Sequence, residues 1–284
     1  MVTETVQQKI TTSATASFAI IIVKAYKDIK ILDRTISEWL TDEMQSIPTF
    51  VINKVNNDAD LRQQINLYCK NFDYFITLYN NTPYITKNLI MHIMEYVTAK
   101  KSNACKLFSG FVCNSKYFVS NSNIVYDNFY MQAQDRFATI DDTTDIERAE
   151  KFFSSKVITK HINAGVKFDN PNSVILSSNC TIGYNTLIMN NCVIKGKCTI
   201  GKNVIINNNT TILDSTIGDG SSVSNSIVNK SKIGSNSIIS PYCNIEKSRI
   251  GDNCIIGHYC IVRNTSVKKG QNIAERTTLI KEGK

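Results

Sequence analysis

Residues 198–218 read CTIGKNVIINNNTTILDSTIG, and an aliphatic residue returns there at every fifth or sixth position. The same spacing holds from Leu176 to Leu279. No α-helix has this period, and a single alternating strand repeats every two residues instead. A five- to six-residue repeat is typical of a chain that forms a short strand, turns a corner and begins again. Successive units of this kind stack into a solenoid.

Two further columns of residues accompany the aliphatic one. A small residue stands two positions earlier in most repeats: Cys180, Thr186, Cys192, Cys198, Thr210, Ser215, Ser221, Ser226, Ser231, Ser237, Cys243, Ser248, Cys254, Cys260 and Thr265. Glycine follows the aliphatic residue in one repeat of three, at Gly183, Gly201, Gly218, Gly234 and Gly251. Three hexapeptides therefore make one coil, with a corner where a side chain would obstruct the backbone. The pattern predicts a left-handed parallel β-helix of about six coils over residues 172–284.

Residues 1–153 have a mixed α/β pattern. The continuous apolar run Ser17–Val23 is typical of a buried parallel strand. Further strands are predicted at 49–55, 72–79, 106–112, 117–119 and 136–140, and helices at 31–44, 58–69 and 86–99. The residues Thr144 to Glu147 predict a capping box that opens a helix to about Phe153. We expect a reduced parallel α/β domain, joined by a linker over 154–171 to the β-helix.

Composition narrows the classes of function. A net charge of +8 permits an acidic ligand, but the basic residues are scattered, which argues against nucleic-acid binding. The longest apolar run, Phe18–Val23, is too short to span a bilayer, and an N-terminus with Glu4 and no basic segment argues against a signal peptide. A cytoplasmic protein without a membrane partner is expected.

The cysteines and histidines predict neither disulfides nor a structural metal site. Six of the nine cysteines fall in the small inward column, where cysteine acts as a small buried hydrophobe. No Cys-x-x-Cys pair occurs, and His92, His161 and His258 are far apart in the sequence.

The repeat also carries a family resemblance. The run from Cys180 to Asn264, including the five-residue step in LDSTIGDG (213–220), resembles the β-helix of a bifunctional bacterial enzyme family. That family, here called GlmU-like, acetylates glucosamine-1-phosphate and then joins the product to UTP. FDYFITLYNNTPYITKNLIMHIMEY (72–96) resembles the family's strand that ends at a metal-binding carboxylate, and ATIDDTTDIERAEKF (138–152) resembles its closing strand and helix. The N-terminal domain is thus identified as a truncated nucleotidyltransferase-like domain.

The resemblance implies a first site for a nucleoside triphosphate and Mg²⁺, from which key groups are missing. A nucleotidyltransferase needs a glycine-rich phosphate loop after its first strand, but residues 20–28 contain no glycine and the first glycine is Gly110. Asn81 stands where the family has the aspartate of Gly-Asp, and an amide binds magnesium more weakly than a carboxylate. Asp141 or Asp142 would supply the second metal ligand. The alternative for both is capping of the next helix, and Asn81 is also a turn former.

A second implied site lies on the β-helix. Arg263 in IVRN matches the arginine that holds the sugar phosphate in the family, and Lys281 matches a lysine with the same role. The family's histidine and its acetyl-CoA-binding coils would lie beyond Lys284. His258, beside Gly257, is the candidate base of the kind other hexapeptide acyltransferases use. Arg263 also fits an ordinary solvated corner of a coil.

Three hypotheses about function follow. The first is a catalytically degenerate GlmU-like protein, or pseudoenzyme, that acts as an oligomeric scaffold, regulatory subunit or nucleotide-sugar binder. The second is an active N-acetylglucosamine-1-phosphate uridylyltransferase or hexapeptide acyltransferase of cell-envelope sugar metabolism, which would require Mg²⁺ and a nucleoside triphosphate or acetyl-CoA. The third is a subunit that resembles the gamma or epsilon chains of the eukaryotic translation-initiation exchange factor. The flat faces of a triangular prism predict a homotrimer.

Overall fold

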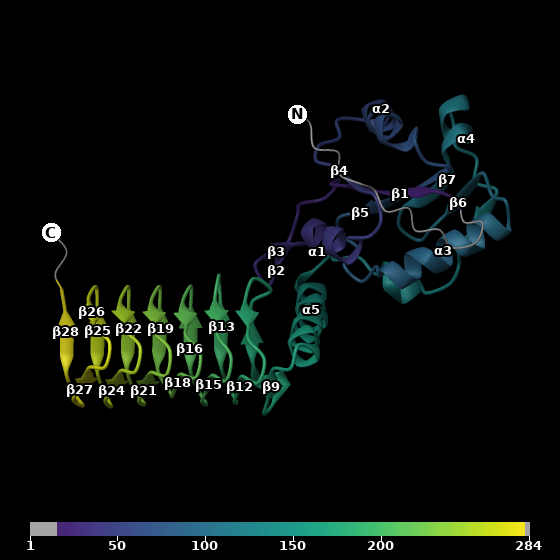
Figure 1. The fold of residues 1–284 in the computed structure, drawn as a ribbon. Coiled ribbons are helices and arrows are strands. Elements are labelled where there is room, and N and C mark those ends of the chain that lie inside the picture. The colour runs from purple at the N-terminus through teal and green to yellow at the C-terminus, as the bar shows by residue number, and fades with distance from the viewer. Residues whose placement is uncertain (1–15, 282–284) are drawn as a thin grey trace, which may run out of the picture. The chain divides into compact units, whose positions relative to one another are not determined.

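The computed structural model describes residues 16–281 and separates the chain into two compact units, Met1–Ala149 and Glu150–Lys284 (Figure 1). Glu4, in the segment expected not to be a signal peptide, lies outside the described residues. Within residues 16–281, none of the helices combines the length and the apolar character that crossing a bilayer requires. The two units are described in turn.

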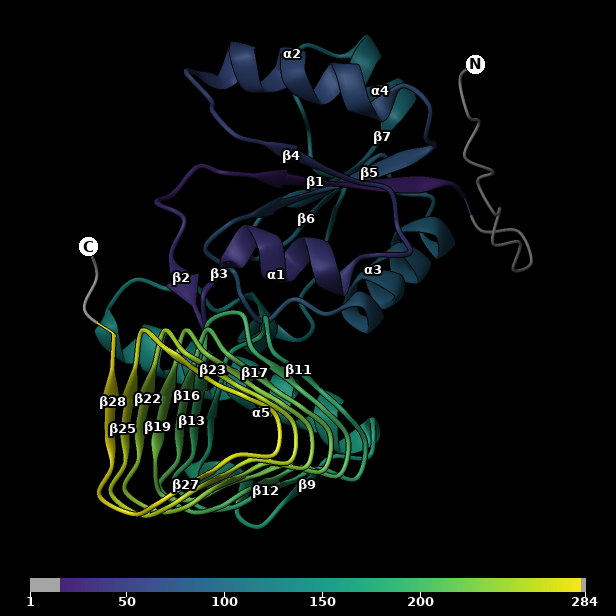
Figure 2. The ribbon, with the colours of Figure 1, turned by 60° about the vertical axis from the view of Figure 1, so that its left-hand side comes forward.

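The first unit is a mixed sheet with helices on both faces. Its strands are β1 (Phe18–Val23), β2 (Lys30–Ile31), β3 (Arg34–Thr35), β4 (Thr49–Ile52), β5 (Tyr74–Tyr79), β6 (Ala104–Lys106), β7 (Phe111–Asn114) and β8 (Asn128–Phe129). Its helices are α1 (Ile36–Glu43), α2 (Asp58–Cys69), α3 (Lys87–Ala99), α4 (Ser115–Ser120) and the 3₁₀ helix η1 (Gln134–Phe137). Figure 2 shows α1 and α3 on one face of the sheet and α2 and α4 on the other.

The main sheet is mixed, because one of its strands runs against the others. Its order is β4-β1-β5-β7-β6-β8, and β1 runs parallel to both β4 and β5. Strand β7 is antiparallel to β5 and to β6, whereas β8 is parallel to β6, so the expected parallel α/β sheet is found with β7 as its one antiparallel strand among residues 16–281. The reason is a tight turn at Gly110, whose φ of +92° is left-handed and whose missing Cβ would lie 2.0 Å from the Thr77 carbonyl oxygen. A side chain there would collide with β5 and disturb the turn that folds β7 back onto β6.

Three predicted short strands differ from the structure. The predicted strand 106–112 is interrupted by the Gly110 turn, so that β6 ends at Lys106 and β7 starts at Phe111. The predicted strand 117–119 lies within helix α4, because the Asn114 side chain accepts a hydrogen bond from the Tyr117 N–H at 3.1 Å and caps the helix. The predicted strand 136–140 overlaps the end of η1 and the irregular chain after it.

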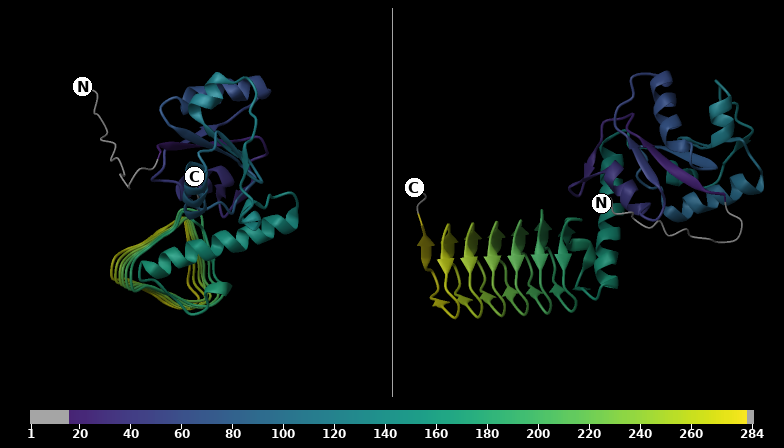
Figure 3. Two further views of the ribbon diagram at one scale, coloured as in Figure 1. Left: turned by 90° about the vertical axis from the view of Figure 1, so that its right-hand side faces the viewer. Right: turned by 45° about the horizontal axis from the view of Figure 1, so that its top comes forward.

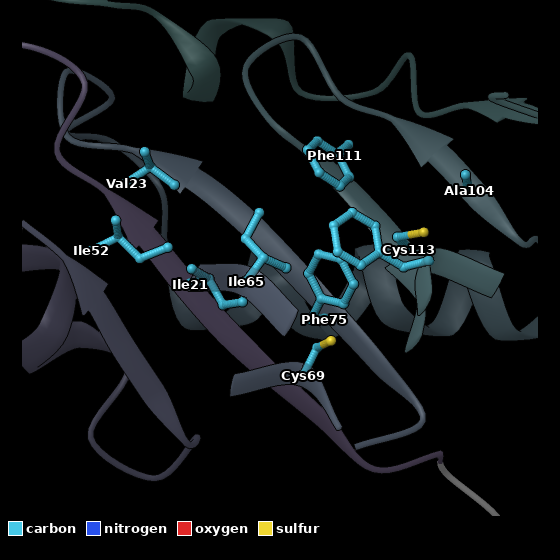
Figure 4. Close-up of a cluster of buried hydrophobic side chains, with 10 residues drawn as sticks. Ile21, Val23, Ile52, Ile65, Cys69, Phe75, Ala104, Phe111 and Cys113 are labelled. Atoms are coloured by element: carbon cyan, nitrogen blue, oxygen red, sulfur yellow. The ribbon is translucent and has the colours of Figure 1, made fainter. Parts of the chain in front are cut away.

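The sheet is held by an apolar cluster on the face that α2 and α4 cover (Figure 4). Phe75 packs edge to face against Phe118 and Phe111, with ring centroids 4.9 and 5.9 Å apart. Strand β1 is apolar throughout because both of its faces are covered, as expected for a central parallel strand. The thiol of Cys113 lies in the same cluster, where burial raises its pKa to about 12 and keeps it protonated.

Helix α5 (Thr143–Asn163) passes from one compact unit to the other. It continues ten residues beyond the predicted end at Phe153, so the first part of the expected linker 154–171 is helical. Phe153, Val157, Ile158 and His161 are buried at helical spacing, which explains why the helix does not stop. The chain then forms β9 (Lys167–Phe168) and the 3₁₀ helix η2 (Pro171–Ser173).

The second unit is a parallel β-helix with a triangular cross-section, seen end on in Figure 2 and along its length in Figure 3. Its first sheet contains β10 (Ile175–Leu176), β13 (Val193–Lys195), β16 (Thr211–Leu213), β19 (Ile227–Asn229), β22 (Asn244–Glu246), β25 (Ile261–Arg263) and β28 (Thr278–Ile280). The second contains β11 (Thr181–Ile182), β14 (Thr199–Ile200), β17 (Thr216–Ile217), β20 (Lys232–Ile233), β23 (Arg249–Ile250) and β26 (Ser266–Val267). The third contains β9, β12 (Leu187–Ile188), β15 (Ile205–Ile206), β18 (Ser222–Val223), β21 (Ile238–Ile239), β24 (Ile255–Ile256) and β27 (Asn272–Ile273). Two of the three sheets have seven strands, so the β-helix has about seven turns rather than the predicted six.

The columns read from the sequence form the interior. The aliphatic column is almost fully buried, and the serines of the small column bridge successive turns: Ser221 Oγ donates to the Gly234 carbonyl at 2.7 Å and accepts from the Ser237 N–H at 3.0 Å. The six cysteines of this column are buried as free thiols. Buried hydroxyls therefore satisfy the backbone while filling little space.

The recurring glycine serves close approach between turns. At Gly218 and Gly234 an added Cβ would lie 2.5 Å from the backbone of the next turn, yet neither glycine has a left-handed φ. The left-handed positions occur two residues later, at Asn203, Gly220 and Asn236 among others. Each corner therefore has two requirements. One position must lack a Cβ because the next turn is so close, and the position two residues later must tolerate a left-handed φ.

Candidate functional site

The carboxyl ends of β1 and β5 form the edge where the resemblance places the nucleotide. Asn80, which directly follows β5, is fully buried and has both ends of its amide engaged. Its Nδ2 donates to the Tyr26 carbonyl at 2.8 Å, and its Oδ1 accepts from the Tyr26 N–H at 3.0 Å. The Asn80 N–H in turn donates to the Val23 carbonyl at 3.2 Å. The chain after β1 is therefore tied to the chain after β5 by main-chain and side-chain bonds.

The charged residues after β1 are paired with one another. Lys24 Nζ lies 3.0 Å from Asp28 Oδ2, and both side chains are largely shielded from solvent. The Asp28 Oδ1 also lies 3.4 Å from the Ser37 N–H at the start of α1. In the family this stretch holds the phosphate loop, whereas here its lysine neutralises a carboxylate of the same chain.

The structure brings Asn81 and Asp141 together. The Ile140 N–H donates to the Asn81 carbonyl at 3.0 Å, which places the residue after Ile140 beside the end of β5. Asn81 is 6% exposed, and its Oδ1 is buried without a hydrogen-bond partner. The backbone beside Asp141 is thus bonded to the backbone of Asn81, 60 positions away in the sequence.

Asp142 and Asp145 cap helix α5. Asp142 Oδ1 accepts from the Asp145 N–H at 2.9 Å, and Asp145 Oδ2 accepts from the Asp141 N–H at 3.2 Å. Asp142 is thus the N-cap, and Asp145 reaches back to the residue before it; this cap lies two residues before the capping box predicted at Thr144. Asp145 also pairs with Arg148 at 2.8 Å, and Asp141 Oδ2 accepts from the Thr139 hydroxyl at 2.5 Å.

These donors do not fit a magnesium–nucleotide centre. Mg²⁺ prefers six oxygens in octahedral geometry, with carboxylates among them and phosphates from the substrate. The edge offers the Asn81 amide oxygen and the Asp141 carboxylate, while Asp142 is engaged as a helix cap. In the part of the chain from 16 to 281, no three or more His, Cys, Asp or Glu side chains are grouped so that they could hold a metal ion.

On the β-helix, Arg263 and Lys281 are neighbours and His258 stands apart from them. Arg263 ends β25, and its carbonyl accepts from the Lys281 N–H one turn further on at 3.2 Å. The Arg263 Nε lies 2.9 Å from Glu246 Oε2, its register partner on β22. His258 is exposed on the corner before β25, at the opposite end of that strand from Arg263.

Sequence reasoning missed two of these contacts. The clamp between Asn80 and Tyr26 joins residues 54 positions apart, and no periodic pattern relates them. Glu246 and Arg263 lie 17 residues apart, which is the length of one coil at this point. Their pairing could therefore have been predicted from the repeat length.

Comparisons with known proteins agree with the β-helix. Residues 179–214 match the family model "Bacterial transferase hexapeptide (six repeats)", and residues 206–281 match "GlmU-like, C-terminal hexapeptide". A crystal structure of a Bacillus cereus gene product covers 40% of this chain and 71% of its own at 20% identity, with a TM-score of 0.19 that is too low to support an inference.

Three curated relatives have the name bifunctional protein GlmU. The Bacillus subtilis protein is 34% identical over 106 residues (37% of this chain, 23% of its own), and that of Clostridioides difficile is 33% identical over 103 residues (36% and 22%). The Thermoanaerobacter pseudethanolicus protein is 26% identical over 164 residues (56% and 35%), a match longer than the β-helix that includes residues before Lys167.

The chain spans between about a fifth and about a third of the length of these relatives. The residues that match the two hexapeptide family models lie within the three-sheet solenoid. Residues 179–281 of this chain are therefore similar to bacterial transferase hexapeptide repeats and to the C-terminal hexapeptide repeats of GlmU-like proteins.

Proposed function

We propose that this chain is a GlmU-like protein without nucleotidyltransferase activity that acts as a homo-oligomeric scaffold. The observation that carries the proposal is the Asn80–Tyr26 clamp. A phosphate loop binds a triphosphate through backbone N–H groups that are free to point at the ligand. Here the Tyr26 N–H is already satisfied by a buried side chain, and the chain turns directly from β1 into the segment that leads to α1.

The charges at the same edge support this proposal. Lys24, the first cation after β1, is held by Asp28, so it is not free to neutralise charge that develops during phosphoryl transfer. Asp142 is committed to capping α5, which leaves Asp141 as the one carboxylate beside Asn81. We infer that the residual edge stabilises the fold of the first unit.

The β-helix supports the scaffold role through its outer surface. Ile238 and Ile255 are register partners on the third sheet, and Ile205 lies in the same column two turns before Ile238, with Ser222 between them; all three remain 42–46% exposed. Tyr242 and Tyr259 stand at the neighbouring corner, stacked with ring centroids 5.0 Å apart and more than half exposed. We call these five residues the apolar ladder. Exposed apolar residues gathered in this way are typical of a surface that packs against another protein.

A pyrophosphate-release assay tests the absence of nucleotidyl transfer. The full chain is incubated with MgCl₂, UTP and N-acetylglucosamine-1-phosphate, with the Bacillus subtilis relative as the positive control. We expect no release above the enzyme-free blank, and none from the Asn81→Asp variant, because restoring the aspartate of the Gly-Asp pair does not restore the loop. Release that disappears in Asp141→Ala would overturn the proposal.

Two further measurements separate the other hypotheses from this one. Acetyl transfer from acetyl-CoA to glucosamine-1-phosphate that is lost in His258→Ala would make the chain an acyltransferase. Stoichiometric recovery of translation-initiation subunits with the tagged chain from its native cells would place it with the exchange-factor chains. The scaffold proposal expects neither result.

A further inference from the structure

A groove of about 730 Å³ runs along the β-helix at the corner between the first and second sheets. Two rows of polar and charged side chains flank it. One row stands on the corner itself: Asp214, Lys230, Lys247, Asn264 and Lys281. The other stands on the outer face of the second sheet: Lys232, Arg249 and Ser266. Between the rows, the small residues Ser231, Ser248 and Thr265 form the floor.

The corner row is held in strict register by the backbone. The N–H groups of Lys230, Lys247 and Asn264 donate to carbonyls of the preceding turn at 2.9, 2.9 and 3.0 Å. The floor is equally fixed, because Ser248 Oγ donates to the Glu246 carbonyl at 2.7 Å and accepts from the Thr265 N–H at 3.2 Å. The cations are therefore presented at the strand spacing of about 4.8 Å per turn.

The groove has a strong excess of positive charge. It contains five cations, Lys230, Lys232, Lys247, Arg249 and Lys281, and one acid, Asp214. Asp214 Oδ1 is turned to the preceding coil, where it accepts from the Lys197 N–H at 3.0 Å. Of the five cations only Lys247 has a carboxylate within 4.0 Å among residues 16–281: its Nζ is 3.9 Å from Glu246, which pairs more closely with Arg263 at 2.9 Å.

Lysine is an unexpected residue at this corner. Lys230 and Lys247 have φ values of +47° and +45°, in the left-handed region that side chains other than Asn and Asp disfavour. The equivalent positions of other turns carry Gly196, Asp214 and Asn264, residues that tolerate this conformation. Strained residues that persist in a fold are a sign of function, and here they add two adjacent charges to one wall of the groove.

We propose that this groove binds an extended anion with several consecutive phosphate groups. From Lys230 to Lys281 the corner row rises three turns, roughly 14 Å at the spacing of neighbouring strands, which is more than a single phosphate can bridge. Lysine and arginine both bind phosphate oxygens well, arginine through two parallel N–H bonds. The lining contains no aromatic side chain, which disfavours single-stranded nucleic acid because its bases need stacking partners.

The test uses inorganic tripolyphosphate as the probe and isothermal titration of the full chain. The key variant is Lys230→Asn/Lys247→Asn, since Asn264 occupies the equivalent corner and shows that asparagine fits there. The matched control is Lys268→Gln/Lys269→Gln, which removes the same charge from an exposed corner outside the groove. Thermal unfolding of each variant verifies that it is folded.

We expect the full chain to bind tripolyphosphate more tightly than orthophosphate, and the Lys230/Lys247 variant to lose about tenfold or more in affinity, which corresponds to the loss of charge-assisted contacts. The control variant should bind as the unaltered chain does. Equal losses in both variants would mean diffuse attraction to a basic surface and would overturn the proposal. So would unchanged affinity in the groove variant, or tighter binding of a thymidine oligonucleotide than of tripolyphosphate.

Discussion

At the scale of single residues, a buried amide holds the edge of the first unit. Asn80 makes two hydrogen bonds to the main chain of Tyr26, and removing its side chain leaves a buried N–H and a buried carbonyl without these partners. An unsatisfied buried polar group costs about 1–3 kcal/mol, which makes Asn80 a stability residue whatever the ancestry of the site.

We therefore expect Asn80→Ala to lower the free energy of unfolding by about 2–4 kcal/mol, because both partners on Tyr26 are lost together. Urea denaturation followed by circular dichroism measures the difference. Asn81→Ala is the matched control, since the Asn81 Oδ1 has no hydrogen-bond partner to lose. Equal losses in the two variants would contradict the clamp.

His161 is a residue that makes the stability of the fold depend on pH. It is 7% exposed in α5, and burial, followed by the charge of Lys160, lowers its pKa below the ordinary value of 6.5. The unfolded chain then binds the proton more readily than the folded chain. Stability from the neutral imidazole is fully present above pH 6.5 and is lost as the pH falls toward the lowered pKa.

We expect the thermal midpoint of the full chain to fall between about pH 7 and pH 5, where the carboxylates are still largely ionised. His161→Gln, which has no titrating group at this position, should show a flatter profile over the same range. If the thermal midpoint of the variant fell with pH as steeply as that of the unaltered chain, another titrating group would be the cause.

At the scale of secondary-structure elements, the β-helix depends on turns that come unusually close. A Cβ on Gly218 would lie 2.5 Å from the Ser235 backbone nitrogen, and backbone cannot move aside as a flexible side chain can. We expect Gly218→Ala to cost about 1–3 kcal/mol of unfolding free energy, the usual range for overpacking. Chemical denaturation of the two-unit chain gives the value.

Gly270 is the control for that prediction. It is left-handed, with φ of +74°, and nothing lies within 4 Å of an added Cβ. Asparagine occupies the equivalent corner at Asn236 and Asn253, so Gly270→Asn should change stability by less than about 1 kcal/mol. If Gly218→Ala were as mild as Gly270→Asn, close approach would not be the reason for the glycine column.

At the scale of the whole molecule, the apolar ladder predicts self-association. A triangular β-helix has flat faces, and the third sheet presents Ile205, Ile238 and Ile255 to solvent. The second sheet instead presents mainly threonine, serine, lysine and arginine. Burial of apolar area stabilises association by about 25 cal/mol per Å², so the third sheet and its Tyr242–Tyr259 corner are the surface we expect to pair.

Light scattering coupled to size exclusion should give a mass of about three times the 31.9 kDa of one chain. Ile255→Glu/Tyr259→Glu should reduce the mass toward that of the monomer, because burying two unpaired carboxylates is costly. Thr199→Glu, on the polar second sheet, should leave the mass unchanged. A mass near 32 kDa for the unaltered chain would contradict the predicted trimer.

Periodicity made the β-helix predictable. Its contacts recur every 16 to 18 residues, so the inward aliphatic residues, the small column and the coil length can all be read as columns. The same holds for β1, β4 and β5 with their helices, where local apolar runs and caps such as Asn57 and Thr86 specify the elements. The predictions failed where short segments carry no clear period. Residues 31–35 form the β2–β3 hairpin before α1, 106–112 is divided by the Gly110 turn, 117–119 lies in the capped helix α4, and 136–140 overlaps η1.

The sequence by itself determined which side chains face the interior of the solenoid, because each residue there contacts residues one coil away in the chain. It also revealed that the N-terminal domain lacks the glycine-rich phosphate loop and the aspartate of the Gly-Asp pair that the family resemblance implies. Only the tertiary structure decided that Asn80 binds Tyr26 and that the rows of lysines flank one groove. These contacts depend on where separate strands end in space, which the local physics of each segment does not specify.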